Sequence, residues 1–132
     1  MSEPTTQHHH PPMPTALVSR PGIMQQSLRA SLAACPGLEL VGAYGDGLTA
    51  LNHVMTDAPA LLVIDSNLLD EEVAALLAAV KAQYATTHCV VLIRSSQRAA
   101  WARASGADAV VPHDGSMHEL MAVLARFRVN LL

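Results

Sequence analysis

One carboxylate in this sequence stands where a folded chain would place a reactive group. Asp65 directly follows residues 60–64, the run ALLVI, whose five apolar side chains are typical of a buried strand. Because the end of such a strand is partly desolvated, a carboxylate there tends to be a metal ligand, a nucleophile or a cap for the next loop. A nucleophile is the most specific of these three roles.

Short apolar runs and helical segments alternate from residue 15 onward, and this alternation predicts the elements that hold Asp65. Strands are predicted at 15–19, 38–44, 60–64, 88–93 and 108–111, and helices over 23–35, 48–55, 73–80, 98–105 and 117–127. Apolar strands that alternate with helices indicate a parallel sheet covered on both faces and joined by right-handed crossovers. The predicted fold class is a doubly wound α/β fold. Ligands bind such sheets beyond the carboxyl ends of the strands, where Asp65 is expected to lie.

Length and composition predict a single domain. The chain has 132 residues, of which 51% are hydrophobic and 14% charged, and its formal net charge of -3 argues against disorder and against general nucleic-acid binding. No apolar run approaches the ~20 residues that cross a bilayer, and the N-terminus lacks the order of a signal peptide, so we expect a cytoplasmic protein. Residues 1–14 are rich in proline and histidine and predict a disordered tail, which leaves residues 15–132 as the domain.

Other chemical sites are poorly represented. The sequence has no glycine-rich phosphate loop, no nucleophile elbow and no Cys-x-x-Cys pair. Cys35 and Cys89 fall within periodic apolar segments and are expected to pack in the core without a disulfide. Three carboxylates at residues 70–72 open a predicted helix, where they complement its dipole, so we interpret them as a solvated N-terminus.

Three segments, together with the order of the elements, resemble the receiver domains of bacterial two-component response regulators. The segment LVSRPGIMQQSLRASLAACPGLELVGAYGDGLTAL is similar to the first two βα units of the family. The segment LLVIDSNLL is similar to its phospho-acceptor strand, and ASGADAVV to the segment that enters its last strand. The resemblance covers residues 15 to about 127. It implies a five-stranded sheet with the order 2-1-3-4-5.

The resemblance also implies a role for Asp65, since this residue matches the aspartate that attacks a phosphoryl group. Asn67 matches the position whose backbone carbonyl binds Mg2+ in the family. The acidic pair that completes the metal site is replaced by Ser19 and Arg20, so any metal site at Asp65 and Asn67 is expected to be weak or absent. The guanidinium of Arg20 could instead pair directly with Asp65 in place of the metal.

The positions that read out phosphorylation in the family also differ here. Arg94 stands in place of the hydroxyl residue, although Ser95 and Ser96 follow it and could serve with a one-residue shift. Val110 replaces the aromatic switch residue, and His113 replaces the lysine at the end of the last strand. The sole lysine, Lys81, falls in the predicted third helix. The segment between the fourth and fifth strands is shorter than usual in the family, which predicts a short fourth helix.

Two hypotheses of different classes follow. The favoured one is an atypical or pseudo-receiver, a protein-interaction module that is not an enzyme and uses no cofactor. The alternative is a phosphorylatable receiver that takes a phosphoryl group at Asp65 from a histidine kinase with the help of Mg2+. In both cases we expect a protein partner, either the kinase or a separate effector, and no direct contact with nucleic acid or membrane.

A homodimer, or the binding of a dedicated partner helix, is also predicted through the last helix and its neighbouring strand. The C-terminal segment carries more apolar residues than a stripe of ~100° against a sheet can use. They are Met117, Leu120, Met121, Val123, Leu124, Phe127, Val129, Leu131 and Leu132. Some of this apolar surface is therefore expected to meet a partner.

Overall fold

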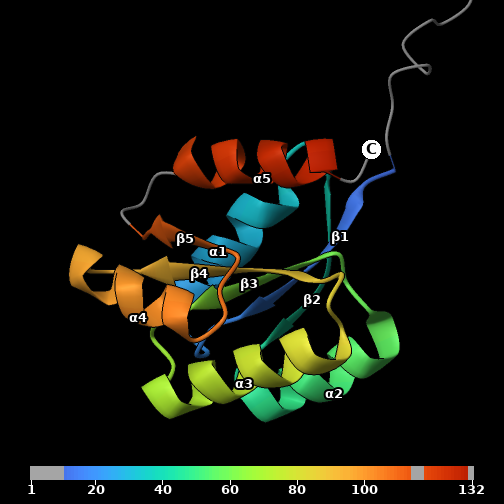
Figure 1. The fold of residues 1–132 in the computed structure, drawn as a ribbon. Coiled ribbons are helices and arrows are strands. Elements are labelled where there is room, and N and C mark those ends of the chain that lie inside the picture. The colour runs from blue at the N-terminus through green and yellow to red at the C-terminus, as the bar shows by residue number, and fades with distance from the viewer. Residues whose placement is uncertain (1–10, 114–117, 131–132) are drawn as a thin grey trace, which may run out of the picture.

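Five parallel strands form one central sheet in the computed structural model, in the order β2-β1-β3-β4-β5 (Figure 1). The structure describes residues 11–113 and 118–130. The strands are β1 Met13–Val18, β2 Leu38–Tyr44, β3 Leu61–Asp65, β4 His88–Ile93 and β5 Ala109–Pro112. This topology confirms the predicted doubly wound α/β fold and its strand order.

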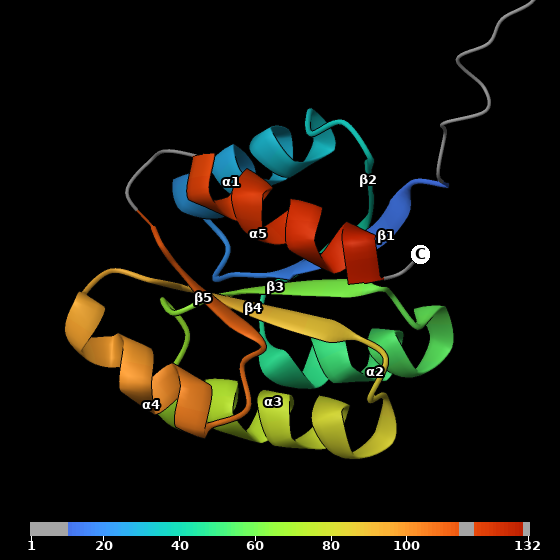
Figure 2. The same ribbon diagram turned by 45° about the horizontal axis from the view of Figure 1, so that its top comes forward.

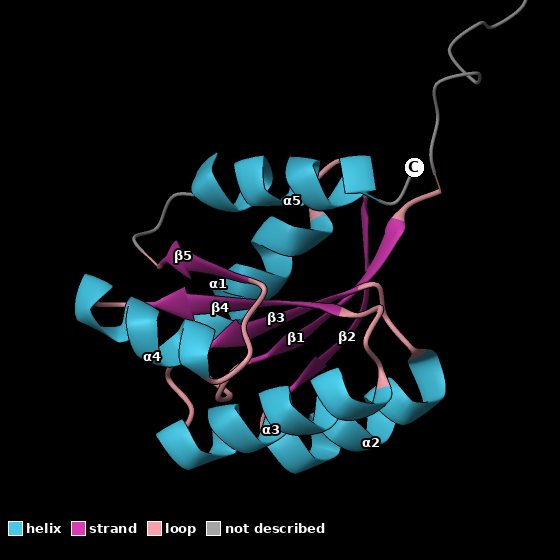
Figure 3. Cartoon of the chain, viewed as in Figure 1, coloured by secondary structure: helices cyan, strands magenta, loops and turns pink. Residues whose placement is uncertain are grey.

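The helices cover both faces of the sheet, as Figures 2 and 3 show. They are α1 Ile23–Ala33, α2 Gly47–Asp57, α3 Asp70–Gln83, the 3-10 turn η2 Ser96–Arg98, α4 Ala99–Ala104 and α5 His118–Asn130. Helices α1 and α5 lie on one face, while α2, α3 and α4 lie on the other. The fourth helix has only six residues, so the prediction of a short α4 is confirmed.

The central strand β3 shows why its apolar run is unbroken. Leu61 and Val63 contact the core under α1 and α5, whereas Leu62 and Ile64 contact the core above α2 and α3. All four side chains have no exposed surface. Because each such side chain contributes about 1.5–3 kcal/mol when fully buried, both layers are anchored on this strand. The strand therefore fixes the position of Asp65 rigidly.

The first strand begins two residues earlier than the sequence predicts. Met13 is part of β1 and only 3% exposed, and its N–H donates to the carbonyl of Gly37 at 2.8 Å. Pro14 also belongs to β1, although proline has no backbone N–H to donate. At this position β1 pairs only with β2, because the pairing with β3 begins at Thr15, so the sheet tolerates the proline there. The predicted boundary at residue 15 was therefore wrong by two residues. Residues 1–10 of the predicted tail lie outside the described residues.

Helix α5 uses its apolar side chains to cover the sheet. Phe127 is 7% exposed and stacks on His88 with 4.3 Å between ring centroids. Three more side chains of α5 are buried in the same core and a fourth is partly buried against it, namely Leu120, Val123, Leu124 and Met121. The predicted surplus of apolar surface is therefore wrong for the described part of this helix. Met117, Leu131, Leu132 and the side chain of Val129 lie outside the described residues.

Both cysteines are buried and free, as the sequence predicts. Burial raises the pKa of the Cys89 thiol to about 12, which keeps it protonated and inert. None of the described helices has the length and apolar composition needed to span a membrane.

Candidate functional site

Asp65 is the last residue of β3, and its side chain is completely buried at the carboxyl end of the sheet. Its Oδ2 accepts a hydrogen bond from the Ser19 hydroxyl at 3.1 Å, and its Oδ1 accepts one from the Asn67 N–H at 3.2 Å. A buried carboxylate needs such donors to offset the loss of water. Both oxygens of Asp65 therefore have partners supplied by the chain itself.

Ser19 is held in place by neighbours on both sides. It follows β1 directly and is fully buried, and its carbonyl accepts a hydrogen bond from the Gln25 side chain at 2.6 Å. The Asn67 amide also lies 3.4 Å from the Ser19 hydroxyl, which it can donate to. The hydroxyl thus receives one bond and gives another to Asp65. Ser19, Asp65 and Asn67 form a small closed network.

Arg20 binds the loop after β3 and not the Asp65 carboxylate. Its Nε donates to the backbone carbonyl of Asn67 at 2.6 Å, and its backbone N–H donates to the Asn67 side-chain oxygen at 3.2 Å. No ion pair links Arg20 to Asp65 among the residues that the structure describes. The predicted direct pair was therefore wrong. Arg20 is exposed while Asp65 is buried, and a guanidinium would lose its hydration to reach that carboxylate.

The residues present do not fit a Mg2+ ion. Mg2+ requires near-octahedral oxygen coordination with carboxylate ligands, and here one carboxylate is available, with both oxygens hydrogen-bonded. The Asn67 carbonyl, which matches the metal-binding carbonyl of the family, faces the Arg20 cation at 2.6 Å. Within residues 11–113 and 118–130 there is no group of three or more His, Cys, Asp or Glu side chains suited to a metal.

His113 is the one switch position that the fold brings close to Asp65. It follows β5, its N–H donates to the Ile93 carbonyl at 2.6 Å, and its side chain is 9% exposed. Its Nε2 lies 3.8 Å from Asp65 Oδ2, too far for a hydrogen bond, and has no hydrogen-bond partner among the described residues. A buried nitrogen without a partner is uncommon in folded proteins. Sequence reasoning predicted this position but not its unpaired state.

The other predicted switch positions do not contact Asp65 through any described hydrogen bond. Arg94 directly follows β4 and is exposed, whereas Val110 is partly buried against the α2–α3 layer. The Ser95 hydroxyl accepts a hydrogen bond from the Gln97 N–H at 3.3 Å, so it caps the 3-10 turn η2. Arg94, Val110 and Ser95 therefore do not belong to the closed network of Ser19, Asp65 and Asn67.

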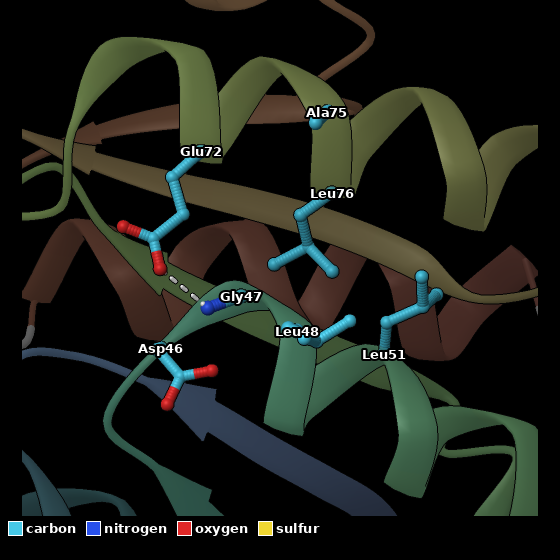
Figure 4. Close-up of a pocket in the computed structure, with 7 residues that line it drawn as sticks. All are labelled: Asp46, Gly47, Leu48, Leu51, Glu72, Ala75 and Leu76. Carbon is cyan, nitrogen blue, oxygen red and sulfur yellow. Dashed lines mark hydrogen bonds between the residues drawn. The ribbon is translucent and has the colours of Figure 1, made fainter.

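The carboxylates at the start of α3 have specific partners, which the sequence analysis missed. Asp70 pairs with Arg98 of η2. Glu72 reaches across to α2, where its Oε2 accepts a hydrogen bond from the Gly47 N–H at 2.6 Å (Figure 4). Asp70 and Glu71 are exposed in the first turn of α3, as the interpretation of a solvated N-terminus predicts, and this interpretation was wrong only for Glu72. The GDG turn before α2 offered a signal, because the first N–H groups of a helix need acceptors.

A hollow of about 290 Å³ lies beside the Glu72 contact, between α2 and α3. Its walls are mostly apolar and include Leu48, Leu51 and Leu76 (Figure 4). Asp46 at its edge caps α2 by accepting from the Thr49 N–H at 2.8 Å, and this hydrogen bond lowers the pKa of the Asp46 carboxyl. Both carboxylates at this hollow are thus used in holding α2 in place.

Lys81 lies in α3, as predicted, and is occupied at the opposite end of the sheet. Its Nζ pairs with Asp108 at 2.7 Å, and the same Asp108 oxygen accepts from the Cys89 N–H at 2.7 Å. This arrangement ties α3 to the start of β4 and to the loop before β5. The chain's single lysine therefore has a structural role far from Asp65.

Comparisons with known proteins support the fold. The sequence matches no protein-family model and no curated protein sequence. The structure superposes on the signal receiver domain of NarL from Mycobacterium tuberculosis with a TM-score of 0.78 and 18% identity, covering 90% of this chain and 98% of that one. The isolated receiver (REC) domain of RcsB from Salmonella enterica serovar Typhimurium, studied with the phosphomimetic beryllofluoride, gives a TM-score of 0.73 and 18% identity, covering 86% of each chain.

A longer RcsB structure from Salmonella typhimurium, described in terms of DNA interaction, gives a TM-score of 0.76 and 16% identity. The match covers 92% of this chain and 61% of that one. The chain therefore has the fold of response-regulator receiver domains, as its sequence pattern predicts, and it spans about three fifths of the longer RcsB chain.

Proposed function

We propose that this chain is a receiver-like signalling module that works through contacts with other proteins and does not use Mg2+-dependent phosphorylation at Asp65. The supporting observation is the pairing of the oxygens that a metal would need. Ser19 donates to Asp65 Oδ2 at 3.1 Å, and Arg20 donates to the Asn67 carbonyl at 2.6 Å. A cation would have to displace both donors, and only one carboxylate would then face it.

The alternative is a phosphorylatable receiver that takes a phosphoryl group at Asp65 from a histidine kinase, with Mg2+ as cofactor. The position of Asp65 at the tip of β3 favours it, because a carboxylate there can reach a phosphoryl donor. The RcsB receiver domain, which has the same fold, was studied with beryllofluoride. That compound is therefore the sharpest probe of the choice between the two functions.

The deciding experiment is a titration followed by amide chemical shifts. Mg2+ is added to about 10 mM, a concentration that saturates weak sites, and beryllofluoride is added afterwards. We expect no saturable shift at Asp65, Asn67 or Arg94 in the wild-type protein. A saturable response to both additions would establish the phosphorylatable receiver instead.

The matched control is the double variant Ser19→Asp, Arg20→Asp. It supplies two further carboxylates and frees the Asn67 carbonyl, so we expect it to bind Mg2+ with a Kd on the order of 1 mM. A shift in the double variant and none in the wild type would assign the difference to Ser19 and Arg20. Thermal melts of both proteins confirm that each is folded under the conditions of the titration.

We also propose that the chain forms a homodimer. Because the described apolar side chains of α5 face the core, the interface would use the exposed side of this helix. The exposed residues of this helix include Ala122 and Ala125, which are small enough for a close approach of two helices. Phe127→Glu is a poor probe, because Phe127 is part of the core. Sedimentation at tens of micromolar is the measurement. We expect a dimer that Ala122→Glu dissociates, and a monomeric wild-type protein would show that any partner is a different chain.

The proposed module has no catalytic turnover of its own and acts in the cytoplasm. It makes no direct contact with nucleic acid, in keeping with the net charge of -3. Its partner is a kinase or a separate effector protein. Affinity capture of the wild-type protein beside the α5 variant tests whether partner binding and self-association use the same surface.

A further inference from the structure

A second hollow lies at the carboxyl end of β4 and β5, where α4 crosses them. It has a volume of about 290 Å³, close to the lower limit of about 300 Å³ for pockets that bind small molecules. Ile93, Ala99 and Val110 give it an apolar surface. Val110 and Ala99 are small, and α4 is only six residues long, so no larger side chain of the described chain fills this space.

The rim of this hollow carries positive charge that lacks partners among the residues that the structure describes. Arg94 and Arg103 line it, and neither guanidinium group makes a hydrogen bond or an ion pair with another residue of the described ranges 11–113 and 118–130. Two other arginines are engaged, Arg20 with Asn67 and Arg98 with Asp70, while the exposed Arg29 and Arg126 also lack a described side-chain partner. The chain as a whole has a net charge of -3, so two unpaired guanidinium groups at one hollow are a local reversal of its charge.

His113 adds a third polar group to the same wall. Its side chain is 9% exposed and its Nε2 has no hydrogen-bond partner among the described residues, while Asp65 Oδ2 lies 3.8 Å away. Glu119 is the acidic residue among those that line the hollow, and it forms no described ion pair with either arginine. The lining therefore combines an apolar floor with an excess of groups that attract an anion.

We propose that this hollow binds a small organic acid, in which an apolar ring or short chain carries one carboxylate. The apolar body lies against Ile93, Ala99 and Val110, and the carboxylate pairs with Arg94 and Arg103, whose planar guanidinium groups match a carboxylate in a bidentate geometry. Inorganic phosphate supplies the charge without the apolar body, so it leaves the floor of the hollow uncovered. Ser19, Asp65 and Asn67 are not among the residues that line this hollow, although His113 in its wall lies 3.8 Å from Asp65 Oδ2.

Such a ligand would contact β4, β5 and α4 together. Residues of all three elements line the hollow, so an occupied site links the short helix to the sheet edge. A ligand that binds one arrangement of α4 more tightly than another shifts the population toward it. The site therefore gives the module a way to respond to a metabolite without phosphorylation.

Phenylacetate is the probe, with phenylacetamide as its neutral counterpart and inorganic phosphate as the anion without a ring. Each is titrated to about 10 mM while the amide shifts of Arg94, Ala99 and Val110 are followed. We expect saturable shifts with phenylacetate, at least roughly tenfold weaker binding of phenylacetamide, and no saturable shifts with phosphate. Equal binding of acid and amide, equal binding of phosphate, or no saturable shift with phenylacetate would each overturn the proposal.

Variants locate the binding. Arg103→Gln changes an exposed side chain and is expected to weaken phenylacetate binding by roughly tenfold, the weight of one charge-assisted contact. Val110→Phe fills the hollow and is expected to abolish the shifts. The control is Arg29→Gln, an exposed arginine of α1 on the other face of the sheet, which should leave binding unchanged. If Val110→Phe fails to fold, Arg103→Gln still decides, and an unchanged affinity in that variant would refute the site.

Discussion

Two polar regions lie close together at the carboxyl end of the sheet, and they differ in how completely their side chains are paired. Around Asp65, each carboxylate oxygen accepts a hydrogen bond from the chain. In the hollow between β4, β5 and α4, the two guanidinium groups and the His113 Nε2 have no hydrogen-bond partner among the described residues, and His113 Nε2 lies 3.8 Å from Asp65 Oδ2. The first region is closed by its own residues, whereas the polar groups of the second have no such closure within residues 11–113 and 118–130, and for this region we propose a ligand. A fully paired polar site and a partly unpaired one can thus lie next to each other within one fold.

The largest effect is expected from breaking the closed region. Asp65→Asn keeps the shape of the side chain but turns one of its two acceptors into a donor, so either Ser19 or the Asn67 N–H loses its acceptor. We expect the free energy of unfolding to fall by about 1–3 kcal/mol, the cost of leaving a buried donor unsatisfied. Urea denaturation measures it.

The sign of the stability change in Asp65→Asn shows whether the buried carboxylate is stabilised by its hydrogen-bond donors or is repelled by its surroundings. Asp46→Asn is the control, because Asp46 is an exposed carboxylate and Asn also caps helices well, so little change is expected there. An Asp65→Asn protein more stable than the wild type would mean that the buried charge is repelled and not held by its donors.

Filling the open region is expected to give a smaller effect of opposite sign. Val110 is partly exposed beside the hollow, so Val110→Phe adds buried apolar surface and should raise the free energy of unfolding by about 1 kcal/mol. The same change at Val91, which is fully buried in β4, should lower it by about 1–3 kcal/mol through overpacking. Equal losses at both positions would show that the hollow cannot accept a ring. Thermal and urea denaturation of the two variants provide the comparison.

The smallest effects on stability are expected for Arg20→Gln and Arg103→Gln. Comparing them tests whether Arg20 has a partner within the chain and Arg103 has none. Arg20→Gln removes an exposed contact to the Asn67 carbonyl and should cost at most about 0.5–1 kcal/mol. Arg103→Gln removes a cation near Arg94 and should leave stability within about 0.5 kcal/mol of the wild type. A loss at Arg103 as large as that at Arg20 would point to an internal partner for Arg103. Parallel urea denaturation at low and high salt measures both.

The sequence predicted the sheet because its signals are local. The apolar run before Asp65 and the helical spacing after it follow from the need to bury both faces of β3, and this need does not depend on details elsewhere in the chain. The start of β1 was missed because the prolines and histidines of residues 1–14 suggested a tail, while the Met13 N–H is paired with the carbonyl of Gly37, far along the chain. Tertiary contacts outweighed local composition there.

The polar contacts of the site were harder to predict, because they depend on which side chain reaches which acceptor. Ser19 and Arg20 were expected to stand in place of an acidic pair, with Arg20 pairing with Asp65, whereas in the structure Ser19 binds Asp65 and Arg20 binds the loop after β3. The sequence could not show that Arg20 binds the Asn67 carbonyl and not Asp65, since the choice is set by the burial of the carboxylate. The unpaired Nε2 of His113 likewise follows from a separation of 3.8 Å that no pattern of residue types encodes.

The contacts of Ser19 and Arg20 also have an evolutionary consequence. Replacing Ser19 alone by aspartate would place a second carboxylate beside the fully buried Asp65 without adding a cation, and like charges in a buried site destabilise the fold. Replacing Arg20 alone would free the Asn67 carbonyl but leave Ser19 bonded to Asp65. Neither single mutation yields a metal-binding protein for selection to keep. We therefore expect the effects of the two substitutions on metal binding to be non-additive, so that only the double variant gains a metal site.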